Sequence, residues 1–384
     1  MKKIAAMLVC ATMCFAMAAT ASAETVKIGV YEPASGDNGA GGKQETLGIQ
    51  YANTVQPTVE IGGEEYDVEL VIVDNQSSTD KAVSAASELV SSGVSVVLGS
   101  YGSGVSIAAA DTFKAASTPA IGVTCTNPQV TDGNDYYFRI CFLDPFQGTV
   151  LANFATENFS AMKAYSLTKL GDDYSTGLGY YFCKAFQDLG GEVIEEAFPE
   201  GTSDFTAYIS KAVSEGCDVI FAPVSTEAAQ LIIDQASAQG VSVPLLAGDT
   251  WDSNVILNAA KGTDLDIYVT TFYQEGANEE FDNGIKEWMN SDSTALANNG
   301  GDDTVAAVTA MGYDAYFVAL TALQNAGSTD PQAVYEALPA TTYTGVSGEI
   351  AFDEIGDAAR DTAFVKTANT ESGAWDFVAE QGIN

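Results

Sequence analysis

Two short segments combine hydroxyl groups with free backbone amides directly after apolar runs. Residues 100–104 (SYGSG) precede a helical stretch, where unpaired N–H groups and the helix dipole favour an anion such as a carboxylate. Ser103 adds a hydroxyl to these groups. Residues 124–128 (TCTNP) offer the hydroxyls of Thr124 and Thr126, which could bind both ends of a zwitterion. Each segment also has a purely structural interpretation, the first as a helix N-cap and the second as a turn.

Two further segments place acidic or aromatic groups after apolar runs. In residues 248–252, the carboxylate of Asp249 could balance a ligand ammonium, and the ring of Trp251 could wall an apolar part of the ligand. Tyr174, in residues 171–175, could cover a ligand with its phenol. The alternatives are a solvated surface acid and a tyrosine that caps the core.

The composition argues against most enzyme chemistry. The chain has no histidine, which removes nucleophiles that depend on an imidazole base and zinc sites with histidine ligands. The glycine-rich stretches at 36–42 and 99–104 match neither the dinucleotide fingerprint nor the phosphate-binding loop, and Ser103 is not framed as G-x-S-x-G. No carboxylate pair stands out for glycoside hydrolysis among 52 acids. We therefore expect no enzyme, no cofactor and no metal site.

The charge balance excludes two classes of partner. Against 52 Asp and Glu the chain has 15 Lys and Arg, a formal net charge of −37. Such a surface repels nucleic acid and anionic membranes. Hydrophobic residues make up 46% of the chain, which indicates a globular protein rather than a disordered one.

The chemistry-bearing segments follow strands in a regular strand–helix alternation. Strands rich in Val and Ile that alternate with amphipathic helices indicate parallel sheets covered on both faces. Two such series predict an α/β fold of two doubly wound lobes, with ligand loops at the carboxyl ends of the strands. The predicted strands are 26–31, 66–74, 94–98, 119–124, 164–170, 192–198, 218–223 and 243–247, and the predicted helices are 45–54, 79–93, 105–116, 175–188, 205–214 and 226–239.

The first 23 residues read as a secretory signal peptide. Lys2 and Lys3 precede an apolar run at 4–19, and small residues at 21–23 supply a cleavage site before Glu24. A transmembrane anchor is the alternative, but the run is shorter than the ~20 residues that span a bilayer. A lipoprotein would use Cys10 or Cys14, which lack the preceding small residue. We expect a soluble protein secreted to the periplasm or the extracellular cell surface.

Four further cysteines follow the signal peptide. No C-x-x-C spacing occurs among them, so a structural metal site is not expected; they are Cys125, Cys141, Cys183 and Cys217. Export permits disulfides, and free buried thiols fit the sequence equally well.

The chain resembles the branched-chain amino-acid (Leu/Ile/Val) substrate-binding proteins of ABC transporters, which have the type I periplasmic-binding fold. Each matching segment is weak alone, but their order along nearly the whole chain is specific. The matching segments are 28–36, 74–82, 97–103, 124–128, 138–148, 172–177, 204–206, 218–220, 244–249 and 352–357.

The resemblance implies a clamp of two lobes joined by three crossings, in which an amino acid is trapped when the lobes close. It implies an N-terminal lobe of 24–144 plus 273–347 and a C-terminal lobe of 145–272 plus 348–384. The protein would capture an apolar or branched-chain amino acid, act as a monomer and deliver the ligand to a membrane permease.

The resemblance also assigns the two charged ends of the ligand. Ser103 and Thr126 would hold the α-carboxylate through hydroxyl and backbone N–H groups. The α-ammonium would bind the Thr124 carbonyl, the Thr126 hydroxyl and Asp249. Both charged ends of the buried ligand would then be paired, which is necessary because a buried charge is tolerated only when its partners are present.

The remaining implied contacts surround the ligand side chain. Tyr174 would close over the ligand, Tyr101 would shape the side-chain pocket, and Ser225 lies in a further ligand-facing loop. Some relatives have an aromatic residue where this chain has glycine and alanine at 39–42. One wall of the pocket is therefore absent or is supplied by another residue.

Two other functions compete with amino-acid transport. The same clamp could bind another small solute, such as an amide, urea or an aromatic acid, or serve as a sensor component. A neutral or anionic solute would leave Asp249 unpaired, which favours an ammonium ligand. An acid-based hydrolase is the third interpretation.

Overall fold

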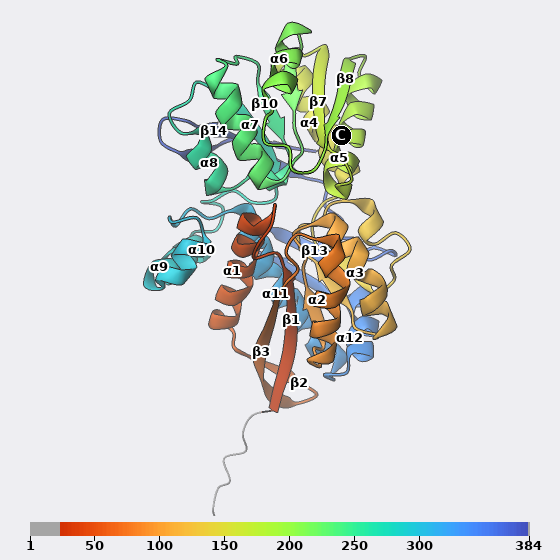
Figure 1. Cartoon of the computed structure of the whole chain (residues 1–384). Coiled ribbons are helices and arrows are strands. Elements are labelled where there is room, and N and C mark those ends of the chain that lie inside the picture. The colour runs from red at the N-terminus through yellow and green to blue at the C-terminus, as the bar shows by residue number, and fades with distance from the viewer. Residues whose placement is uncertain (1–23, 383–384) are drawn as a thin grey trace, which may run out of the picture.

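The computed structural model describes residues 24–382, and the predicted signal peptide at 1–23 lies outside the described residues. Two lobes lie end to end, each built on its own β-sheet with helices on both faces (Figure 1). The described residues begin in the first lobe and end in the second (Figure 1). The predicted α/β architecture of two doubly wound lobes is confirmed.

The first sheet has six strands in the order β2-β3-β1-β4-β5-β6. All neighbours pair in parallel except β2 and β3, which form an antiparallel hairpin. The hairpin turn is Gly62 and Gly63, which both have positive φ, as a two-residue turn of this kind requires. The strands are β1 (Glu24–Glu32), β2 (Thr58–Ile61), β3 (Glu64–Asp74), β4 (Val96–Leu98), β5 (Ala120–Gly122) and β6 (Tyr137–Arg139).

Helices cover both faces of this sheet because its side chains alternate between two hydrophobic clusters. Ile28 and Val30 of β1 pack in the cluster that contains α1, α9 and α11, whereas Tyr31 packs with α2 and α3. The helices of this lobe are α1 (Gly39–Val55), α2 (Thr79–Ser91), α3 (Ser103–Ala115), α9 (Glu279–Ser291), α10 (Ser293–Asn298), α11 (Ala307–Ala326) and α12 (Pro331–Ala337), with short 3₁₀ turns η1 (Pro128–Val130) and η3 (Leu338–Ala340) and a hairpin of β12 (Thr342–Gly345) and β13 (Gly348–Ala351).

The second sheet has seven strands in the order β15-β14-β11-β10-β9-β7-β8. Its first five strands along the chain are parallel, as the alternation predicts, but β14 and β15 are antiparallel additions at one edge. The short turn between β14 and β15 allows only antiparallel pairing. The strands are β7 (Lys163–Lys169), β8 (Glu192–Phe198), β9 (Val219–Phe221), β10 (Leu245–Ala247), β11 (Ile267–Thr271), β14 (Ala363–Asn369) and β15 (Ala374–Gln381).

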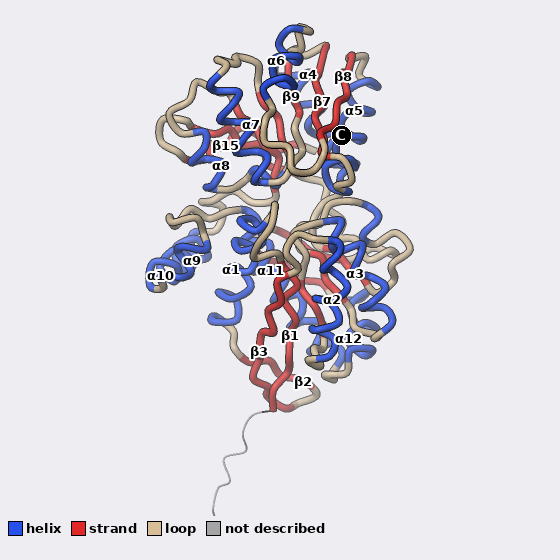
Figure 2. The backbone as a smooth tube through the Cα atoms, in the orientation of Figure 1, coloured by secondary structure: helices blue, strands red, loops and turns tan. Residues whose placement is uncertain are grey.

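Helices again lie on both faces of the second sheet (Figure 2). One face packs against α4 and α5, and the other packs against α6, α7 and α8. The helices are α4 (Asp144–Phe159), α5 (Asp173–Asp188), α6 (Thr206–Ser214), α7 (Thr226–Ala238) and α8 (Asn254–Ala260), and the 3₁₀ turn η2 (Asp249–Trp251) follows β10. Trp251 is fully buried in the second-lobe core, and its predicted role as a wall for the ligand stays a prediction.

The chain crosses between the lobes after β6, after β11 and between β13 and β14. A buried ion pair fixes two of these regions together: Arg139 Nη2 lies 2.7 Å from Asp357 Oδ1. Arg139 also donates to the carbonyl of Cys125 at 2.9 Å, which ties the loop after β5 to the third crossing. Our lobe boundaries stay a prediction. Ile350 of β13 packs in the first-lobe core, which favours a third crossing after Ala351.

The four cysteines after the signal peptide are all buried and unpaired. Cys125 and Cys141 lie in the first lobe, and Cys183 and Cys217 in the second. Of the two possibilities that the sequence left open, the structure has free buried thiols.

Close packing of α1 on α11 depends on two glycines. A Cβ atom at Gly48 would lie 1.9 Å from the carbonyl oxygen of Thr309, and one at Gly312 would lie 2.2 Å from the carbonyl oxygen of Glu45. Both obstacles are backbone atoms, so a side chain at either position would push the helices apart.

We predict that Gly48→Ala lowers the free energy of unfolding by about 2 kcal/mol, because overpacking of this kind costs ~1–3 kcal/mol. Gly284→Ala in α9 is the comparison variant, since its Cβ would meet the end of the Tyr51 side chain, with the hydroxyl oxygen at 2.1 Å and Cζ at 3.2 Å, rather than backbone. Thermal unfolding of both variants checks this, and equal melting temperatures would contradict it.

Candidate functional site

The predicted ligand loops meet where the two lobes face each other. Ser103 begins α3, and its Oγ accepts a hydrogen bond of 3.2 Å from the backbone N–H of Asn127. The side chain of Asn127 then donates across the interface to the carbonyl of Asp173, at 2.7 Å. The two first-lobe segments are therefore joined to each other and to the start of α5.

The hydroxyls of Thr124 and Thr126 differ in their hydrogen bonds. Thr124 Oγ1 donates to Glu45 Oε2 at 2.5 Å. Thr126 Oγ1 is buried and has no hydrogen-bond partner among residues 24–382, and the same holds for both carboxyl oxygens of Asp144. Asp144 donates its backbone N–H to the Thr126 carbonyl at 2.9 Å. Burial raises the pKa of Asp144 to about 8.

Asp249 is 2% exposed and lies on η2, directly after β10. Its Oδ1 accepts hydrogen bonds from Gln147 Nε2 at 3.0 Å and from the hydroxyl of Tyr174 at 3.3 Å. Burial raises its pKa to about 7, and the Gln147 hydrogen bond opposes the rise. No Lys or Arg of the described chain forms an ion pair with Asp249, although the buried carboxylate of Asp252 has Lys366 Nζ at 2.9 Å. Asp249 is therefore a buried acid that a ligand cation could pair.

Two tyrosines, one from each lobe, converge on Thr250. The hydroxyl of Tyr174 lies 3.2 Å from Thr250 Oγ1, and the hydroxyl of Tyr101 donates to the Thr250 carbonyl at 3.4 Å. Both side chains are buried. The contact between Tyr101 and Thr250 crosses the interface between the lobes.

Tyr101 fills the space above the first turn of α1, which the sequence presented as a glycine loop. A Cβ atom at Gly41 would lie 2.3 Å from Cζ of the Tyr101 ring. The stretch 39–42 is helical rather than a loop, and its glycines admit close neighbours. Tyr101 therefore lies against this glycine-rich turn, and its role as a wall of the ligand pocket stays a prediction.

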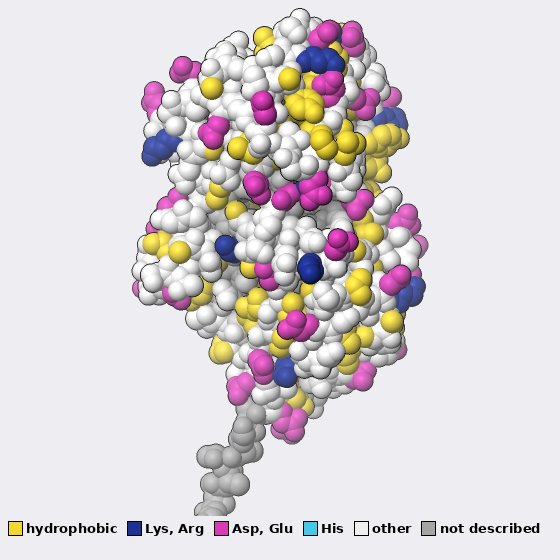
Figure 3. Space-filling model, viewed as in Figure 1, with side chains coloured by type: hydrophobic (Ala, Val, Ile, Leu, Met, Phe, Trp, Pro, Cys, Tyr) yellow, Lys and Arg dark blue, Asp and Glu magenta, His cyan; other side chains and the backbone are white. Residues whose placement is uncertain are grey.

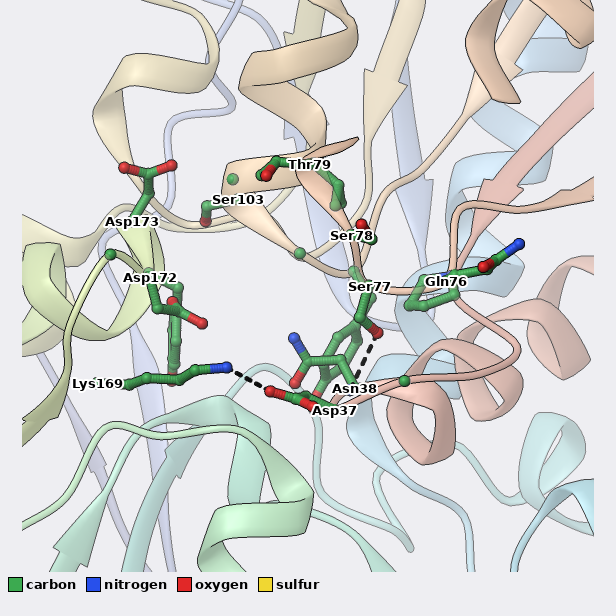
Figure 4. A pocket seen from close by; sticks show the side chains of 18 of the residues that line it. Asp37, Asn38, Gln76, Ser77, Ser78, Thr79, Ser103, Lys169, Asp172 and Asp173 are labelled. Carbon is green, nitrogen blue, oxygen red and sulfur yellow. Dashed lines mark hydrogen bonds and ion pairs between the residues drawn. The ribbon is translucent and has the colours of Figure 1, made fainter. Parts of the chain in front are cut away.

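A pocket of about 270 Å³ lies between the lobes next to these residues (Figure 4). Tyr101, Ser103 and Tyr174 line it, whereas Thr124, Thr126 and Asp249 are buried behind its wall. Ser225 borders a smaller hollow on the other side of the Lys169–Asp37 ion pair. The other lining residues are Pro33, Gly36, Asp37, Asn38, 76–80, Gly102, Gly104, Val105, 169–173, Glu200 and Thr250.

The pocket lining is strongly acidic. Asp37, Asp80, Asp172, Asp173 and Glu200 line it, and Lys169 is the one cation among the lining residues. Lys169 pairs with Asp37 across the interface (Figure 4). Acidic side chains gather at the waist between the lobes in the space-filling view (Figure 3).

Sequence reasoning missed four polar residues at this interface: Glu32, Glu45, Asp144 and Gln147. Asp144 and Gln147 start a helix, so the signal available was their place directly after a predicted crossing. Glu32 ends β1 and Glu45 lies on α1, and nothing local distinguishes them from surface acids.

Within residues 24–382, no group of three or more Cys, Asp or Glu side chains is placed to hold a metal ion. None of the helices described is both long and apolar enough to span a membrane.

Comparison with known proteins gives one family. Residues 25–373 match the family described as periplasmic binding protein. The Leu/Ile/Val-binding protein homolog 1 of Brucella melitensis is 29% identical over 338 residues, which are 86% of this chain and 87% of that protein. The leucine-binding protein LivK of Thermotoga maritima is 34% identical, with a TM-score of 0.81 over 93% of this chain and 99% of that one. LivJ of Streptococcus pneumoniae, solved with isoleucine, is 26% identical, with a TM-score of 0.80 over 94% and 99%.

We predict that Asp249→Asn stabilises the protein at pH 8 in the absence of ligand. An unfolded Asp has a pKa near 3.9, so between about pH 4 and 7 the folded state binds more protons than the unfolded state. Stability contributed by this proton is therefore lost as pH rises through that window. Asparagine does not titrate, so the free energy of unfolding of the variant should exceed that of the parent by roughly 2 kcal/mol at pH 8 and by much less at pH 5.

Urea unfolding at the two pH values measures this gain. Asp111→Asn, at an exposed position of α3, is the matched control and should change stability little at either pH. An Asp249→Asn variant that is less stable than the parent at pH 8 would contradict the prediction.

Proposed function

The chain belongs to the periplasmic binding protein family, and we propose that it captures an apolar or branched-chain amino acid between its lobes for an ABC importer. The observation that carries the proposal is Asp249, a buried carboxyl at the lobe interface with hydrogen-bond donors but no cation. A ligand ammonium would supply the missing positive charge. The names of the Leu/Ile/Val-binding relatives support an amino acid as that ligand.

The α-carboxylate would bind the first lobe. Ser103 stands at the N-terminus of α3, where backbone N–H groups and the helix dipole favour an anion. Thr126 offers a buried hydroxyl that has no partner in the described chain. A buried hydroxyl without a hydrogen bond costs ~1–3 kcal/mol, so a ligand oxygen there would recover a substantial free energy.

The α-ammonium would bind between the lobes. Its three N–H groups would reach the Thr124 carbonyl, the Thr126 hydroxyl and the Asp249 carboxylate. Tyr174 donates to the same carboxylate and would close over the ligand from the second lobe. Tyr101 would form the wall of the side-chain pocket, and Ser225 would face the ligand from a further loop.

Such a protein is a carrier rather than an enzyme, and the binding-protein names of its relatives support this. We propose that it works as a monomer outside the cell, in the periplasm or at the cell surface, and hands its ligand to a membrane permease. The signal-like segment at 1–23 supports export.

We predict that at least one apolar L-amino acid raises the unfolding temperature of the mature protein. At ~100 times its dissociation constant a ligand stabilises by about 2.7 kcal/mol, which thermal unfolding resolves readily. The screen should include the twenty amino acids, small amides and aromatic carboxylates. A flat response to every amino acid would refute the proposal, and a response to aromatic acids alone would favour the other-solute interpretation.

Asp249→Asn should weaken the binding of that amino acid at least tenfold, because an amide keeps the shape but not the charge that pairs with the ammonium. Calorimetric titration against the parent and Asp111→Asn measures the loss. If all three proteins bind equally well, Asp249 does not hold the ligand.

A further inference from the structure

Two buried glutamates meet beneath the proposed ligand loops. Glu32 ends β1 and Glu45 lies on α1, and they are 2% and 0% exposed. The two carboxyl groups are close enough for each to affect the pKa of the other. The oxygens Glu32 Oε1 and Glu45 Oε1 are buried and have no hydrogen-bond donor within residues 24–382.

The other oxygen of each glutamate holds one ligand loop. Glu32 Oε2 accepts the backbone N–H of Tyr101 at 2.7 Å, and Glu45 Oε2 accepts the hydroxyl of Thr124 at 2.5 Å. The carboxyl pair thus connects the loop after β4 to the loop after β5. Both loops carry residues of the proposed amino-acid site.

If both buried carboxyls were ionised, their like charges would repel and each Oε1 would lack a donor; a single proton between them removes the repulsion and supplies the missing donor. No Lys or Arg of residues 24–382 forms an ion pair with either glutamate, and Arg139, which donates to the Cys125 carbonyl, is paired with Asp357. The titratable groups that face the pair are otherwise acids or neutral groups. They are Cys125 and Asp249, from the loops after β5 and β10, and the phenols of Tyr31, Tyr101 and Tyr137. Burial and the neighbouring carboxyl raise the pKa of Glu32, and burial raises that of Glu45 to about 7.

We propose that Glu32 and Glu45 share one proton at neutral pH, and that this protonated pair positions the Tyr101 and Thr124 loops for ligand binding. The two glutamates are positioning residues, since they act through Tyr101 and Thr124. The positioning role rests on the proposed function, whereas the shared proton does not depend on any ligand.

The shared proton is tested by the pH dependence of unfolding without ligand. Unfolded glutamates have a pKa near 4.3 and are ionised above pH 6, so the folded state holds one more proton than the unfolded state. The unfolding equilibrium constant then rises tenfold per pH unit for that proton. In Glu32→Gln an amide N–H replaces the proton, so the rise between pH 7 and 8 should be about tenfold smaller than in the parent.

Glu45→Gln should reduce the pH dependence in the same way, and Glu65→Gln, at an exposed position of β3, should leave it unchanged. Infrared spectra at pH 8 give a second readout, in which either variant at the pair should lose one protonated-carboxyl band. If both Gln variants keep the parent's pH dependence and its bands, the pair does not share a proton.

The positioning role is tested with the amino acid that binds most tightly in the screen. Glu32→Gln should bind within about threefold of the parent at pH 7.5, because the amide preserves both hydrogen bonds. Glu32→Ala should bind at least tenfold more weakly, since Tyr101 N–H loses its acceptor. Equal binding by Glu32→Ala would overturn this role, whereas no binding by the parent would refute the proposed function and leave the pH result standing.

Discussion

The proposed site is organised around a buried carboxyl group that has no cation of its own within residues 24–382. Asp249 lies between two lobes and receives hydrogen bonds from Gln147 and Tyr174, yet no lysine or arginine of residues 24–382 pairs with it. Desolvation of a carboxylate costs several kcal/mol, and hydrogen bonds from neutral groups recover only part of that. The result is an acid whose pKa is raised to about 7 and whose ionised form needs a partner.

Two other buried acids of the same protein are each paired with a cation. Asp252, three residues further on, has Lys366 at 2.9 Å, and Asp357 has Arg139 at 2.7 Å. In each pair the cation neutralises the charge of the acid, and the pair joins segments that are distant in sequence. This contrast supports our proposal that the carboxyl of Asp249 belongs to a site for an external cation. The fold supports them by directing strand ends from both sheets to one interface.

The architecture could be predicted because parallel strands and their covering helices appear in the sequence as a local, periodic alternation of apolar residues. Features that depend on contacts between distant segments could not be predicted in this way. The antiparallel pairing of β14 with β11, for example, depends on the direction in which the chain enters the second lobe. Glu32 and Glu45 each look like a surface acid, and only the packing of α1 on β1 brings them together. The sequence showed Gly41 only as part of a glycine-rich stretch, because its neighbour in the structure, Tyr101, is 60 residues away.

Proton release on ligand binding tests the role of Asp249 most directly. If an ammonium pairs with this carboxylate, binding at pH 6.5 must ionise a group that is mostly protonated beforehand. Calorimetric titration in buffers of different ionisation enthalpy should then detect release of a large part of one proton by the parent protein. Asp249→Asn should release much less. Binding without proton release, or with the same release from the variant, would contradict the account.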